Sequence, residues 1–113
     1  MNCQKKSIVT KRIQKAPIIT ICGSTRFKED ILKAQRDLTM EGNVVLSCPF
    51  FNHADGITMT DEDICLVDHL HQQKIDMSDA IYVVNKGGYI GSSTKNEIKY
   101  ARIAGKRVIF MEK

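Results

Sequence analysis

The sequence predicts a small α/β domain, with a doubly wound, mostly parallel sheet and helices on both faces, as in flavodoxin-like or Rossmann-like folds. Three observations indicate this class. Short β-branched runs alternate with longer amphipathic segments throughout residues 17–113. Glycine or proline lies between most of these segments. The length of 113 residues suits one domain. Strands joined through helices need right-handed crossovers, which make the strands parallel.

The first half of the domain predicts two strands and one helix. Residues 18–22 (IITIC) are short and β-branched, as expected of a buried strand. We expect Ser24 or Thr25 to cap a helix that runs to about Met40. Residues 44–46 (VVL) predict the second strand, and a loop follows it.

The second half predicts two helices and two further strands. Thr60 is expected to cap a helix that continues through about Met77, with acidic residues in its first turn. Residues 80–84 form the third predicted strand, residues 94–104 the next helix, and residues 107–111 the last strand.

A ligand crevice is expected where the order of the strands reverses. Sheets of this class bind ligands beyond the carboxyl ends of their strands at that point. If the order is 2-1-3-4, the reversal falls between the first and third strands. The loops that leave these strands are residues 23–26 and 85–93, and both are rich in glycine and hydroxyl groups.

The segment Cys22-Gly23-Ser24-Thr25-Arg26 has the composition of a phosphate-binding turn. Amides at a helix start, two hydroxyls and a guanidinium together suit an oxyanion. An ordinary helix-capping turn is the alternative, because Gly-Ser-Thr is also common there. No lysine follows the glycines at the spacing of a Walker loop.

Two roles are open for Glu97. Thr94-Lys95-Asn96-Glu97 matches a capping box, in which Glu97 would fold back onto the amide of Thr94. Glu97 also lies at the edge of the predicted buried stripe, four residues before Ala101, so it should face the crevice. A position near a helix N-terminus would keep the carboxylate ionised, which suits a nucleophile. The spacing alone leaves both roles possible.

Residues 18–111 resemble the nucleoside 2-deoxyribosyltransferase superfamily, which includes 2′-deoxynucleoside 5′-phosphate N-hydrolases. The likeness rests on ICGSTRF at 21–27, Pro49, KIDMSDAIYVVN at 74–85 and GSSTKNEIKYARIAGKRVIF at 91–110. The resemblance implies that Glu97 attacks the anomeric carbon and holds a covalent deoxyribosyl intermediate. It also implies that the site contains the following substrate-binding residues: Cys22, Gly23, Ser24, Thr25 and Arg26 around a 5′-phosphate, and Asn85, Gly88, Gly91, Ser92 and Ser93 around the sugar.

The chain departs from the family pattern at two supporting positions. The family usually has an aspartate eight residues before the Ala-Asp pair, and that position is His71 here. The acid or serine expected six residues before the glutamate is replaced by Gly91. Glycoside cleavage usually needs a second group that protonates the leaving base. We expect His71, Asp68 or Asp76 to supply it, although each of them could also be an ordinary helix residue.

The resemblance implies an enzyme that cleaves or transfers at the N-glycosidic bond of a nucleoside or nucleoside 5′-monophosphate, and we expect Glu97, His71 and Asp68 to be its catalytic residues. Water as acceptor gives a hydrolase, and a second base gives a transferase. The alternative is a catalytically silent nucleotide-binding module that keeps Glu97 but lacks the family's supporting aspartates.

Charge is unevenly distributed along the chain. Residues 1–16 carry five of the seventeen basic residues and no acid, whereas the rest of the chain has a net charge of −1. We therefore expect residues 1–16 to be a flexible basic tail and residues 17–113 to be the domain. A domain with a net charge of −1 lacks the basic surface that binds nucleic acid. No apolar run approaches the roughly 18 residues that a membrane helix needs.

The four cysteines indicate a reducing compartment, and we expect the cytoplasm. They are scattered without a C-x-x-C pair, so we expect free thiols. His69 and His71 are two residues apart and point in different directions on a helix, which argues against zinc. We expect no metal and no cofactor.

The predicted helix after Thr60 carries two apolar stripes. Ile64, Val67 and Ile75 would face the sheet, leaving Leu66 and Leu70 as a second stripe. A homodimer that buries this stripe is the favoured interpretation. The alternative is that the loop at 50–59 covers it, with Phe50 and Phe51 as a lid.

Overall fold

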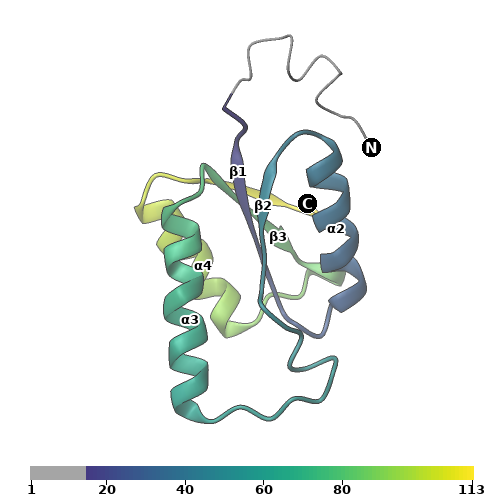
Figure 1. The fold of residues 1–113 in the computed structure, drawn as a ribbon, viewed down its shortest axis with the longest axis vertical. Helices are drawn as coiled ribbons and strands as arrows, with labels where there is room; N and C mark the ends of the chain where they lie inside the picture. The colour runs from purple at the N-terminus through teal and green to yellow at the C-terminus, as the bar shows by residue number, and fades with distance from the viewer. Residues whose placement is uncertain (1–14) are drawn as a thin grey trace, which may run out of the picture.

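Four parallel strands in the order β2-β1-β3-β4 form the centre of the fold (Figure 1). The computed structural model describes residues 15–113, so the predicted basic tail lies almost entirely outside the described residues. The predicted strands are confirmed to within one residue at each end: β1 (Ile18–Gly23), β2 (Val44–Leu46), β3 (Ala80–Val84) and β4 (Arg107–Phe110). The order confirms that the reversal lies between β1 and β3.

Three helices connect the strands and confirm the doubly wound α/β class: α2 (Lys28–Met40), α3 (Asp61–Asp76) and α4 (Ser92–Ile103). Helix α2 covers one face of the sheet, and α3 and α4 lie side by side on the other (Figure 1). A short 3₁₀ turn, η2 (Lys86–Gly88), follows β3. Among residues 15–113, no helix is long and apolar enough to cross a membrane.

The core has two layers because successive side chains of a strand point to opposite faces of the sheet. On β1, Ile21 packs with Ile31 of α2, whereas Cys22 packs with Ile75 of α3 and with residues of α4. Ile81 of β3 is fully buried in the α3–α4 layer. Burying a side chain of that size contributes about 1.5–3 kcal/mol.

The helix starts agree only in part with the sequence predictions. Thr60 is the N-cap of α3, as predicted, and its side chain accepts a hydrogen bond from the amide of Asp63 at 3.0 Å. The prediction that Ser24 or Thr25 caps α2 is wrong, because the N-cap is Phe27. Residues 24–27 instead form a turn, in which the amide of Phe27 donates to the carbonyl of Ser24 at 2.9 Å.

Of the two roles that the sequence leaves open for Glu97, the capping box with Thr94 does not form. Helix α4 begins at Ser92 with Gly91 as its N-cap, and the carbonyl of Gly91 accepts from the amide of Lys95 at 2.9 Å. Thr94 is therefore the third residue of the helix, and it is buried. Glu97 is the sixth, beyond the first turn, where no free cap amide remains for it to satisfy.

Candidate active site

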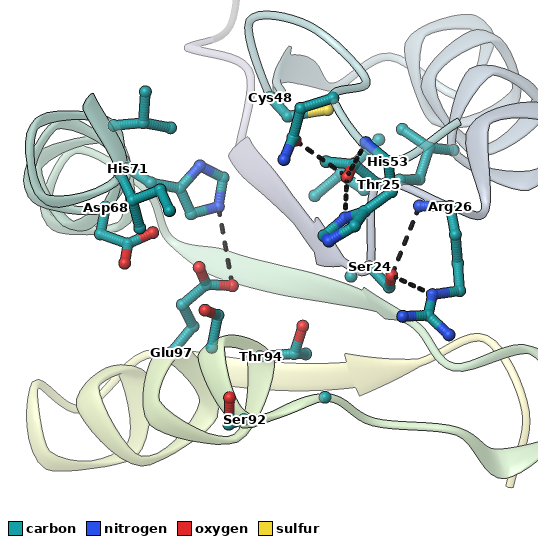
Figure 2. Close-up of a pocket in the computed structure, with 18 of the residues that line it drawn as sticks. Ser24, Thr25, Arg26, Cys48, His53, Asp68, His71, Ser92, Thr94 and Glu97 are labelled. Carbon is teal, nitrogen blue, oxygen red and sulfur yellow. Dashed lines mark hydrogen bonds and ion pairs between the residues drawn. The ribbon is translucent and has the colours of Figure 1, made fainter. Parts of the chain in front are cut away.

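A cavity of about 410 Å³ lies where the strand order reverses, beyond the carboxyl ends of β1 and β3 (Figure 2). Its volume falls in the range of roughly 300–1,000 Å³ that small-molecule sites occupy. Gly23 ends β1 beside it. A Cβ atom on Gly23 would lie 2.9 Å from the carbonyl oxygen of Val84, so glycine is needed for β1 and β3 to approach this closely.

The cavity brings together most of the residues singled out from the sequence. Ten of them line it: Gly23, Ser24, Thr25, Arg26, Asp68, His71, Gly91, Ser92, Ser93 and Glu97. Cys22 is buried behind the wall, in contact with His71. Asn85 and Gly88 are not part of the lining.

One end of the cavity is a cluster of ionisable side chains from three elements. Glu97 of α4 points across to His71 of α3, with 3.9 Å between Oε1 and Nε2 (Figure 2). The same Nε2 lies 3.5 Å from the sulfur of Cys22 at the end of β1. His71 is 7% exposed, so it is not the surface helix residue that the sequence also allowed. Asp68, one turn before His71, reaches the cavity from the same helix.

Burial shifts the pKa values of both partners towards their neutral forms. It raises the pKa of Glu97 from 4.5 to about 7; the neighbouring thiol of Cys22 opposes the rise, and the charge of Asp68 adds to it. Burial likewise lowers the pKa of His71 from 6.5 to about 4, and the positive charge of Lys74 adds to this shift. At neutral pH the imidazole is uncharged, so its contact with Glu97 is not an ion pair.

The expectation that a helix N-terminus keeps Glu97 ionised is therefore wrong. Glu97 lies beyond the first turn of α4, where the helix dipole is weak, and its side chain is only 16% exposed. Desolvation outweighs the dipole. The carboxyl group is poised between its two protonation states near neutral pH, as general acid–base and nucleophilic groups often are.

The opposite end of the cavity offers a cation and hydroxyl groups. The Nε of Arg26 donates to the hydroxyl of Ser24 at 3.0 Å, and the guanidinium lies 4.9 Å from the centre of the Tyr89 ring. Tyr89 in turn meets Phe27 edge to face. The guanidinium is thus held in place while remaining exposed at the cavity, an arrangement suited to an anionic group.

Thr25 joins the two loops that flank this end. Its hydroxyl donates to the side-chain oxygen of Asn52 at 3.0 Å and lies 2.6 Å from Nδ1 of His53. The amide of His53 also donates to it, at 3.2 Å. These contacts fix the loop after β2 against the turn after β1, so the loop forms part of the cavity wall.

Two predicted site residues have structural roles instead. Asn85 is buried, and its side chain exchanges two hydrogen bonds with the backbone of Glu112, at 2.9 and 2.8 Å. It fastens the C-terminal segment rather than contacting the cavity. Gly88 belongs to the η2 turn. Asp76, the third candidate acid, accepts a hydrogen bond from the hydroxyl of Tyr100 at 2.6 Å and does not line the cavity.

Sequence reasoning missed several lining residues. Tyr89, Asn52, His53 and Thr94 all line the cavity. Tyr89 is an aromatic residue in the glycine-rich loop after β3, a signal that could have been used. Thr94 has the local sequence of a helix cap, and nothing local shows that it is buried. The pairing of Asn52 and His53 with Thr25 spans more than 25 residues and has no local signal.

The geometry combines a partly buried carboxyl group with an anion-binding end in one cavity. A scan against models of protein families finds no match for this chain, and a search of curated proteins finds no matching relative.

Proposed function

We propose that the cavity binds a nucleoside or nucleoside 5′-monophosphate and that Glu97 attacks the anomeric carbon to cleave the N-glycosidic bond. One observation carries this proposal: Glu97 and the Ser24–Arg26 turn line the same cavity from opposite ends (Figure 2). A nucleotide presents its phosphate and its anomeric carbon at separate points, and this cavity offers a matching group at each. Tyr89, beside Arg26, adds an aromatic surface.

The reaction can be written with the residues present. The ionised carboxylate of Glu97 bonds to the anomeric carbon while the carbon–nitrogen bond breaks, and its electron pair leaves with the base. A proton must reach that base. Asp68 is the better placed of the two candidates, because it lines the cavity one turn before His71, whereas His71 at a pKa of about 4 holds no additional proton at neutral pH. Attack by water, or by a second base, on the glycosyl ester then releases Glu97.

His71 has a different role in this scheme. Its Nε2 lies 3.9 Å from Oε1 of Glu97, and both side chains are largely buried. A neutral imidazole at this place orients the carboxyl group without holding it in an ion pair. We therefore propose His71 as a positioning residue. The resemblance to the nucleoside 2-deoxyribosyltransferase superfamily supports Glu97 as the nucleophile, since the nucleophilic glutamate of that superfamily aligns with Glu97.

Incubation with a panel of nucleosides and their 5′-monophosphates tests the proposal. Free base is measured by chromatography, with Glu97→Gln as the matched inactive variant. We expect release from wild type and none from the variant. Equal release from both would remove Glu97 from the mechanism.

A catalytically silent nucleotide-binding module is the second candidate. The observation that favours it is the replacement of the family's supporting aspartate by His71, which is neutral at this site. Binding of a monophosphate measured by calorimetry, together with no release of base from any member of the panel, would establish this alternative in place of the enzyme.

A further inference from the structure

Three donor atoms of different chemistry converge at the closed end of the cavity. The sulfur of Cys22, a ring nitrogen of His71 and a carboxylate oxygen of Glu97 all lie within 4.8 Å of one another. They come from β1, α3 and α4, and each is held by packing: Cys22 is 1% exposed, and Ile75 and Ile98, near His71 and Glu97 on their helices, are both core residues.

The arrangement does not fit a catalytic Cys-His-acid relay. In a relay, the nucleophile and the acid contact opposite nitrogens of the imidazole. Here Nε2 of His71 faces both the sulfur of Cys22, at 3.5 Å, and the oxygen of Glu97, at 3.9 Å. Burial also raises the pKa of the Cys22 thiol, which makes it a poor nucleophile at neutral pH. The three atoms instead lie within 4.8 Å of one another, close enough to share one ion.

The spacing of the sulfur and nitrogen atoms matches the requirements of zinc. Zinc binds thiolate at about 2.3 Å and imidazole at about 2.0–2.1 Å, so a tetrahedral site separates sulfur from nitrogen by about 3.5 Å. The observed distance between Cys22 Sγ and His71 Nε2 is 3.5 Å. A carboxylate oxygen would lie about 3.4 Å from the nitrogen, so Oε1 of Glu97, now at 3.9 Å, must move closer to His71 when the metal binds. Thiolate and imidazole select zinc over magnesium or calcium.

We propose that Cys22, His71 and Glu97 bind a Zn²⁺ ion, with the remaining coordination position directed to the cavity that His71 and Glu97 line. On binding, the metal replaces the thiol proton, which passes to the solvent. Metal on Glu97 removes the free carboxylate that the proposed glycosidic chemistry needs. Zinc is therefore an inhibitory ligand of this cavity. This consequence rests on the proposed function, whereas the metal site itself does not.

Cobalt(II) titration of the full-length, metal-free protein tests the site, because a cobalt–thiolate bond gives an ultraviolet charge-transfer band. The background is a variant with Cys3→Ser and Cys65→Ser, which removes two cysteines that are not among the proposed ligands. We expect one cobalt ion per chain and a thiolate band that Zn²⁺ abolishes by displacement. Cys22→Ser should remove the band, and Cys48→Ser, which alters another cavity thiol, should leave it. Absence of the band in the background protein, or its survival in Cys22→Ser, would overturn the proposal.

A second measurement covers the case in which Cys22→Ser does not fold. Competition with a chromophoric chelator gives the zinc affinity of the background protein and of its Glu97→Gln and His71→Gln variants. Loss of one ligand should weaken binding by more than about 100-fold, since losing even an outer-shell contact costs about 10- to 100-fold. Unchanged affinity in both variants would refute the site. Zinc binding without release of base from any substrate would contradict the proposed function and leave this site standing.

Discussion

His71 and Glu97 meet at 3.9 Å across the gap between α3 and α4, and burial shifts the pKa of one down and of the other up. The pair is therefore neutral over the pH range in which a solvent-exposed pair would be ionised. Cys22 of β1, Cys48 after β2, and Asp68 and Lys74 of α3 are titratable groups that interact with this pair. The ionisation of Glu97 should therefore change both the free energy of unfolding and the rate of base release with pH.

Replacing Glu97 should stabilise the metal-free protein at alkaline pH. The native pKa of about 7 exceeds the unfolded value of 4.5, so the contribution of Glu97 is fully present below about pH 4.5 and is lost as the pH rises through about 7. Glu97→Gln removes this loss. Relative to wild type, the variant should gain about 1–3 kcal/mol between about pH 5 and pH 8.

Urea unfolding at the two pH values, with a chelator present, measures this gain. His71 has a depressed pKa, so it contributes stability above about pH 6.5 that is lost towards pH 4. This contribution is present in both proteins and cancels in the comparison. Glu41→Gln, an exposed substitution at the end of α2, is the matched control and should show no comparable gain. A gain equal to that of the control would mean that Glu97 is solvated.

The pH dependence of base release should follow the same ionisation. If Glu97 acts as a nucleophile, kcat/KM in the presence of a chelator should rise about tenfold per pH unit below pH 7 and level off above it. Steady-state kinetics with a 5′-monophosphate substrate over a range of pH measures this rise in kcat/KM. A profile that is already level at about pH 5 would show that the acting carboxylate has an ordinary pKa.

The sequence pattern was sufficient for the fold because every strand and helix has its own local signal. The β-branched run at 18–22 and the glycines between elements depend on no distant contact. The same local reasoning failed at α4. Thr94 and Glu97 match a capping box as well as Thr60 and Asp63 do, yet only the second pair forms one. The difference lies in tertiary packing, which buries Thr94.

The closed end of the cavity could not be predicted for a related reason. In the sequence, His69 is the histidine nearest to His71, and the structure places it beside Gln73 on the exposed face of α3. The atoms that do approach His71 belong to Cys22 and Glu97, 49 and 26 residues away. Only the packing of α3 and α4 on the sheet brings these residues together.

Arg26 should determine the preference for monophosphates over nucleosides. Arg26→Ala removes the guanidinium that Ser24 and Tyr89 hold at the cavity. The preference should fall by about 1.5–3 kcal/mol, the scale of a charge-assisted hydrogen bond. Calorimetry with a matched nucleoside and monophosphate measures it. Lys28→Ala is the control, because this nearby cation pairs with Asp55 at 2.9 Å and does not line the cavity. Equal affinity of wild type for both ligands would rule out a phosphate site.

The last prediction concerns the outer surface of α3. Leu66 and Leu70 are 57% and 45% exposed, as the predicted second stripe requires. The expectation that Ile64 faces the sheet is wrong, because it is 42% exposed and lies at the cavity wall. The alternative lid is not supported either: Phe51 packs against the α2 side of the core, beneath the ammonium group of Lys28. An apolar stripe beside a cavity is suited to burial against a second copy.

We therefore expect wild type to form a homodimer and a variant with Leu66→Glu and Leu70→Glu to be monomeric. Light scattering at micromolar concentration measures the mass, and circular dichroism checks that the variant is folded. Ile103→Glu on α4, where the isoleucine is 79% exposed, is the matched control and should remain dimeric.

The dimer would also affect the cavity. Since Ile64 and Val67 of α3 line the cavity, a partner bound to α3 would help to close it. Base release per chain should then fall on dilution below the dissociation constant. A wild-type monomer would contradict both the dimer and this shared closure.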